Sequence, residues 1–226
     1  MVNSSKPKIQ KKKKIGLIFD LDGVIVENHI YHFNAWKVVA KNYDLNFNEE
    51  DYLNNMNGKT IREFVRFLQS DASEQEVRKI GREKEIGYRR LYQPYLTPTK
   101  GLLSFLSQAH EFNIPMCIGT SACKENVHFT INGLGIGHYF NSILDDSSLN
   151  KGKPHPEIYQ KCAYSIGLLN EQCLVFEDAL SGIEAGKAAG SKVIALATAH
   201  KKSALNADLI INDFSEINIQ TLFDIL

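Results

Sequence analysis

Short apolar runs of strand length alternate with helical segments along most of the chain. The apolar runs lie at 15–19, 114–119, 142–144, 174–176, 193–197 and 209–211. The helical segments that separate and follow them lie at 102–112, 125–135, 156–167, 180–189 and 215–225. Strands that are apolar at nearly every position are typical of a parallel sheet covered by helices on both faces. The pattern therefore predicts an α/β fold with a doubly wound parallel sheet.

A long helical stretch, from about 29 to 92, separates the first apolar run from all the others. Within it, Ser73-Glu74-Gln75-Glu76 fits a capping box that begins one of the helices. The segment 93–100 contains two prolines and is typical of a linker. We therefore predict a discontinuous sheet domain, made of 15–26 and 99–226, with a small α-helical cap domain inserted at 27–98.

Composition narrows the class of protein. The chain has 226 residues, of which 43% are hydrophobic, and its 26 basic residues balance its 26 acidic ones. No run approaches the roughly 18 apolar residues that cross a bilayer, and the four cysteines form no CxxC pair. We expect free thiols in a reducing, cytoplasmic compartment, a monomer, and neither a membrane nor a nucleic-acid partner.

The first fourteen residues include six lysines. We interpret 1–14 as a flexible, solvated basic tail. A nucleic-acid-binding arm is the alternative, but the lysines are not interleaved with aromatic residues or arginines.

Polar side chains follow four of the predicted strands. They are Asp20 and Asp22, Thr120 and Ser121, Lys153, and Glu177 and Asp178. In open parallel sheets the ligand site lies beyond the carboxyl ends of the strands. Carboxylates there suit Mg²⁺, while a lysine and hydroxyls suit phosphate oxygens. Each residue alone is more often a turn, cap or surface residue, but four such coincidences are needed to explain the whole set.

The motifs themselves resemble those of the haloacid dehalogenase (HAD) superfamily. Asp20-x-Asp22-Gly23-Val24 resembles its first motif, Thr120 its second, Gly152-Lys153-Pro154 its third, and the glycine-rich segment 177–190 its fourth. The resemblance extends over nearly the whole chain from residue 15. It implies a Rossmann-like core, and the position of the insertion matches subfamily IA, which carries a helical cap. The segment 31–36 resembles the β-phosphoglucomutase-like branch.

This resemblance implies Mg²⁺-dependent phosphoryl transfer with Asp20 as the nucleophile that becomes an aspartyl-phosphate. Asp22 is expected to act as general acid and base, with a pKa raised by the neighbouring carboxylates. Thr120 and the Ser121 amide would hold phosphate oxygens, and Lys153 would neutralise their charge. The implied metal ligands are Asp20, Asp22, Asp178 and Glu177.

The cap is expected to select the substrate. His32 lies where mutase relatives carry a histidine linked to cap closure, although a partly buried histidine beside Trp36 explains it equally well. Arg62 could contact a second anionic group of the substrate or lie on a helix surface. Gly58 and Lys124 complete the predicted substrate-binding set. The mutases resembled here have Lys-Gly where this chain has Asn57-Gly58, so the second phosphate site of a mutase is altered.

These residues favour a phosphatase, a HAD-type phosphoric monoester hydrolase, that acts on a small phosphorylated metabolite such as a sugar phosphate. A β-phosphoglucomutase-type mutase is the alternative, since Lys59 could restore the missing charge. A catalytically inactive HAD-fold binding protein is the alternative of another class.

Overall fold

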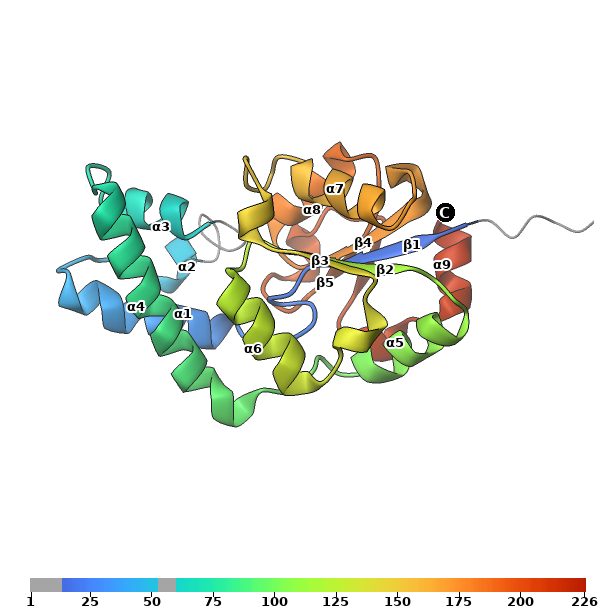
Figure 1. Cartoon of the computed structure of the whole chain (residues 1–226), viewed down its shortest axis with the longest axis horizontal. Helices are drawn as coiled ribbons and strands as arrows, with labels where there is room; N and C mark the ends of the chain where they lie inside the picture. The colour runs from blue at the N-terminus through green and yellow to red at the C-terminus, as the bar shows by residue number, and fades with distance from the viewer. Residues whose placement is uncertain (1–13, 53–59) are drawn as a thin grey trace, which may run out of the picture.

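The computed structural model describes residues 14–52 and 60–226 (Figure 1). Six strands form one parallel sheet in the order β3-β2-β1-β4-β5-β6. Their bounds are β1 (Gly16–Phe19), β2 (Met116–Gly119), β3 (Ser142–Leu144), β4 (Cys173–Glu177), β5 (Lys192–Leu196) and β6 (Leu209–Ile211). The strand order reverses beside β1, as in a doubly wound sheet, so the predicted fold class is confirmed.

The helices within the described residues fall into two groups (Figure 1). The first lies between β1 and β2: α1 (His29–Asn42), α2 (Glu49–Asp51), α3 (Ile61–Leu68) and α4 (Glu74–Tyr92). The second surrounds the sheet: α5 (Leu102–Glu111), α6 (Lys124–Leu134), α7 (Glu157–Ser165), α8 (Leu180–Ala188) and α9 (Ile219–Ile225). None of them has both the length and the apolar character needed to cross a membrane.

One predicted helix is shorter than expected. The pattern predicted a helix over 215–225, but α9 begins only at Ile219, after a separate 3₁₀ turn at Phe214–Glu216. Asn218 separates the two, because its side chain accepts a hydrogen bond from the Thr221 backbone N–H and caps α9.

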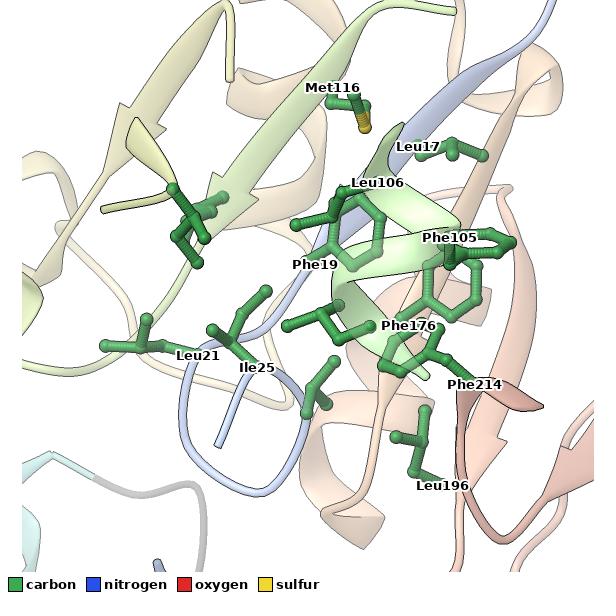
Figure 2. Packing of buried hydrophobic residues seen from close by; sticks show 14 of the residues in the cluster. Leu17, Phe19, Leu21, Ile25, Phe105, Leu106, Met116, Phe176, Leu196 and Phe214 are labelled. Carbon is green, nitrogen blue, oxygen red and sulfur yellow. The ribbon is translucent and has the colours of Figure 1, made fainter. Parts of the chain in front are cut away.

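The central strands β1, β2 and β4 are buried at every position, which explains why they are almost entirely apolar. In β1, Leu17 and Phe19 pack into a cluster with α5 and α9, while Ile18 packs into a second cluster with α7 and α8. On the first face the Phe19 and Phe176 rings stack with centroids 4.7 Å apart, and Phe105 meets both edge-on (Figure 2). Alternate residues of a strand point to opposite faces, so covering both faces requires apolar residues at every position.

The helices α1, α3 and α4 bury a third cluster of their own. Trp36 of α1 stacks on Phe64 of α3 with ring centroids 3.7 Å apart. The other side of α4 carries Tyr88 and Tyr92 into the cluster of the sheet domain. The helices α1–α4 are called the cap helices below. They have a core of their own and also pack against the sheet domain.

Helix α4 begins at the predicted capping box. The Ser73 side chain accepts a hydrogen bond from the Glu76 backbone N–H, and the Glu76 carboxylate accepts one from the Ser73 N–H. We expect Ser73→Ala to lower the free energy of unfolding by about 1 kcal/mol, because it leaves a helix-end N–H without its acceptor. Urea unfolding measures this value. Ser104→Ala, on the exposed surface of α5, is the control and should change stability by less than about 0.5 kcal/mol.

Candidate active site

A pocket lies where the carboxyl ends of β1, β2 and β4 face the cap helices. The sheet domain lines it with Asp20, Asp22, Thr120, Ser121, Lys153 and Asp178. The cap helices and their loops add His29, His32, Trp36, Thr60, Lys84 and Glu85. The fold thus brings together side chains that lie more than a hundred residues apart in the chain.

Lys153 is the central cation of this pocket. Its Nζ atom lies 2.8 Å from Asp20 Oδ1 and also donates a hydrogen bond to Glu177 Oε1, and the lysine is fully buried. Burial lowers the pKa of Lys153, but the carboxylates of Asp20 and Glu177 raise it above its ordinary value. Lys153 is therefore a permanent positive charge held against the candidate nucleophile.

Glu177 acts mainly as an acceptor that organises the site. One of its oxygens accepts hydrogen bonds from Lys153 and Tyr159, and the other accepts the backbone N–H groups of Asp178 and Ala179. Helix α8 comes so close that a Cβ atom at Gly182 would overlap the Glu177 carboxylate. This close approach accounts for the glycine in the fourth motif.

Three buried carboxylates form a cluster that fits a divalent cation. Asp20, Glu177 and Asp178 each place one oxygen within 4.8 Å of the others. Burial raises the pKa of Asp20, Lys153 lowers it, and Glu177 and Asp178 raise it, so that the resulting pKa is about 8. Asp178 in turn lies so close to Gly23 that any Cβ atom there would overlap it. Closely spaced carboxylate oxygens of this kind are the hard ligands that Mg²⁺ prefers.

Asp22 faces the cap rather than the other carboxylates. Its Oδ1 atom accepts a hydrogen bond of 2.6 Å from Asn28 Nδ2, and its Oδ2 atom lies 3.3 Å from His32 Nε2. Burial raises the pKa of Asp22, but His32, Asn28 and Lys84 outweigh it and lower the pKa to about 2. The expectation that neighbouring carboxylates raise this pKa is therefore wrong for the arrangement observed, because the side chain pairs with cap residues instead.

His32 is buried and connects Asp22 to α4. Its ring stacks on Tyr88 at a centroid distance of 3.7 Å, and its Nδ1 atom lies 2.7 Å from Lys84 Nζ. A lysine ammonium can only donate, so Nδ1 accepts and Nε2 carries the hydrogen that faces Asp22. Burial and Lys84 lower the pKa of His32, which favours this neutral ring. His32 is thus both a buried interdomain histidine and a contact of Asp22.

The sequence interpretation missed several polar residues of the site, among them Asn28, His29 and Lys84. His29 Nε2 lies 3.0 Å from Asp178 Oδ2, and Asn28 also donates to Asp22. Both residues lie at the start of the helix that carries His32, and His29 lies three residues before it, a spacing that places two side chains on one helix face. Lys84 carries no such local signal, since it lies 52 residues from His32.

The phosphate-binding candidates at the end of β2 lie on the pocket wall. Thr120 is buried, and its Oγ1 atom accepts a hydrogen bond from the Ala122 N–H. The Ser121 hydroxyl is buried and has no hydrogen-bond partner among the described residues. A ligand oxygen in the pocket would supply that partner.

The remaining substrate-binding candidates lie elsewhere. Arg62 is exposed on α3, where it forms an ion pair with Glu74 of α4, and it does not line the pocket. Lys124 is the exposed first residue of α6 and does not line it either. Asn126, two residues later, does. Gly58, with Asn57 and Lys59, lies outside the described residues.

Comparisons with known proteins agree with this geometry. Residues 17–196 match the family described as haloacid dehalogenase-like hydrolase. The chain is 30% identical to the β-phosphoglucomutase of Bacillus subtilis over 217 residues, which cover 92% of this chain and 93% of that protein. It is 28% identical to the fructose-1-phosphate phosphatase of Escherichia coli over 179 residues, which cover 79% of this chain and 94% of that protein.

Solved structures give the same result. The chain superposes with a TM-score of 0.85 on a HAD hydrolase of family IA, variant 3, from Entamoeba histolytica. The two are 28% identical, and the match covers 93% of this chain and 98% of the other. The motifs at the four strand ends, the inserted helices and these relatives lead to one conclusion: the chain belongs to the haloacid dehalogenase-like hydrolases.

Proposed function

We propose that the protein is a Mg²⁺-dependent phosphatase that hydrolyses a small phosphate ester, such as a sugar phosphate, through an aspartyl-phosphate on Asp20. The observation that carries this proposal is the buried Lys153, which pairs with Asp20 beside the carboxylates of Glu177 and Asp178. A carboxylate nucleophile needs positive charge around it to approach a phosphate.

The cation would be held by the carboxylates of Asp20 and Asp178 and by the backbone carbonyl of Asp22, with Glu177 beside them. Bound Mg²⁺ would reduce the repulsion between the Asp20 carboxylate and the phosphate oxygens. Lys153, Thr120 and Ser121 would hold those oxygens and orient the phosphorus towards Asp20.

Proton transfer falls to Asp22. Asp20 attacks phosphorus as the ester P–O bond breaks, and Asp22 gives the leaving oxygen its proton. Water then attacks the phosphorus of the aspartyl-phosphate and gives a proton back to Asp22. This attack breaks the bond to Asp20, releases phosphate and restores the Asp20 carboxylate. Because His32 and Asn28 keep Asp22 ionised in the observed arrangement, Asp22 must leave them before it can carry a proton. A movement of the cap helices relative to the sheet domain would achieve this.

The relatives support a small phosphorylated metabolite as the substrate. Their names include a fructose-1-phosphate phosphatase, a phosphorylated carbohydrates phosphatase and a hexitol phosphatase. Purified protein should release phosphate from at least one member of a panel of sugar and polyol phosphates, and EDTA should stop this release. Failure across the whole panel with Mg²⁺ present would favour an inactive binding protein.

A mutase remains the second candidate, because the B. subtilis relative is a β-phosphoglucomutase. β-Glucose 1-phosphate with catalytic β-glucose 1,6-bisphosphate separates the two activities. A phosphatase produces glucose and inorganic phosphate, whereas a mutase produces glucose 6-phosphate with little phosphate release. We expect the first result.

Metal binding can be tested without turnover. At a Mg²⁺ concentration about 100 times Kd, we expect the melting temperature to rise by about 5 °C or more, because the ion binds only the folded protein. Asp178→Asn should remove most of this rise, while the exposed Asp71→Asn should keep it. An equal rise in the wild type and in Asp178→Asn would contradict this metal site.

A further inference from the structure

A second charged group, distinct from the carboxylate cluster, lies on the cap side of the pocket. Glu85 of α4 is buried and lines the pocket. Its Oε1 atom accepts a hydrogen bond of 2.7 Å from Lys84 Nζ, and its Oε2 atom accepts one of 2.6 Å from Asn126 Nδ2. Asn126 belongs to α6 of the sheet domain, and its Oδ1 atom accepts a 2.6 Å hydrogen bond from Arg89 Nη1 of α4. Glu85 therefore joins the cap to the sheet domain inside the pocket.

The charges of the pocket are divided unevenly between its two ends. At the sheet end, Lys153 lies against the cluster of Asp20, Glu177 and Asp178, where the proposed cation and the transferred phosphoryl group would bind. At the cap end, the cation among the described lining residues is Lys84, which is already bound to Glu85 Oε1 and His32 Nδ1. Arg89 is occupied by Asn126. Within the described lining, the cap end therefore offers no uncompensated cation to a second anionic group.

We infer that Glu85 determines substrate specificity: the pocket accepts a monophosphate whose remaining part is uncharged and rich in hydroxyls, and it rejects a second phosphate. This inference rests on the proposed phosphatase function and specifies its substrate class. The buried carboxylate repels a second anion and cancels the charge of Lys84. Its oxygens and the Asn126 amide also offer acceptors and donors to sugar hydroxyls.

Glu85→Gln isolates the charge, because the amide has nearly the same shape and retains an oxygen acceptor. The substitution removes the repulsive charge and leaves Lys84 without its carboxylate partner. Charges about 6 Å apart interact by several times RT at the effective dielectric constant of a protein site. Selectivity between a bisphosphate and a monophosphate should therefore change by about tenfold or more.

The experiment compares fructose 1-phosphate, followed by phosphate release, with fructose 1,6-bisphosphate, followed by the formation of fructose 6-phosphate. We expect the wild type to favour the monophosphate in kcat/KM by at least about tenfold, and Glu85→Gln to shift this ratio towards the bisphosphate by about tenfold. Glu83→Gln is the matched control, because Glu83 lies two residues away on α4, is bonded to Tyr43 and does not line the pocket. It should keep the wild-type ratio.

Three results would overturn the inference and leave the phosphatase assignment intact: a wild type that cleaves both esters equally well, an unchanged ratio in Glu85→Gln, or the same shift in Glu83→Gln. If Glu85→Gln fails to fold, the wild type alone still decides the question with glycerol 3-phosphate and 3-phosphoglycerate, of which the first should be preferred. If neither these esters nor a wider panel release phosphate, the proposed function itself is rejected, and the inference with it.

Discussion

Asp20→Asn is expected to lower kcat for phosphate release by about 10³-fold or more, because an amide cannot act as the nucleophile. The substitution keeps the shape of the side chain, and Lys153 retains Glu177 as its partner. Steady-state phosphate release from the best ester of the panel measures the effect. The other groups proposed to bind phosphate remain in Asp20→Asn. The variant should therefore bind the ester at concentrations similar to those at which the wild type binds it.

The control for this prediction is Asp224→Asn on α9, which removes the same charge far from the pocket. Its kcat should equal that of the wild type. A kcat near the wild-type value in Asp20→Asn, with the fold verified by circular dichroism, would remove Asp20 as the nucleophile and with it the aspartyl-phosphate.

Lys153→Ala should have the largest effect on stability. The variant leaves the buried carboxylates of Asp20 and Glu177 without their shared cation, and Glu177 is completely inaccessible to solvent. Removing one partner of a buried ion pair typically costs about 3–5 kcal/mol, because a buried charge remains uncompensated. Urea unfolding without Mg²⁺ should show a loss of this size, together with loss of turnover.

The matched control is Lys161→Ala on α7. Lys161 forms an ion pair with Glu157 at a position where the lysine side chain is 42% exposed. Exposed pairs contribute about 0–1 kcal/mol, so its loss should be several times smaller. Equal losses in the two variants would show that Lys153 is not the cation on which the carboxylate cluster depends.

Much of the fold follows from local patterns. The six strands of the described sheet were predicted within two residues of their observed ends, because its central strands are buried on both faces and are therefore apolar at nearly every position. The predicted capping box at Ser73 is present. The boundaries 27 and 98 of the cap domain stay a prediction, since the cap helices pack both among themselves and against the sheet domain.

The site was predictable where a residue follows a strand directly. Asp20, Thr120 and Asp178 each lie at the carboxyl end of a parallel strand, and parallel strands bring these ends to one edge. Lys153 lies farther from its strand, in the loop that follows β3, and its motif resemblance supported its place in the site. Gly58 lies outside the described residues, whereas Arg62 and Lys124, which were predicted from the mutase pattern, are exposed and lie away from the pocket lining.

The sequence by itself determined the family, the parallel sheet and the carboxylates at the strand ends, because these depend on periodicity and on motifs a few residues long. The tertiary structure alone decided the state of Asp22, whose pKa is lowered by His32 of α1, by Asn28 just before that helix, and by Lys84 of α4. It also decided that Glu85 meets Asn126 across the boundary between the cap helices and the sheet domain. Electrostatic interactions act through space over a few ångströms. Side chains that are 41 or 52 residues apart in the sequence can therefore affect each other's charge, and no local sequence pattern predicts this.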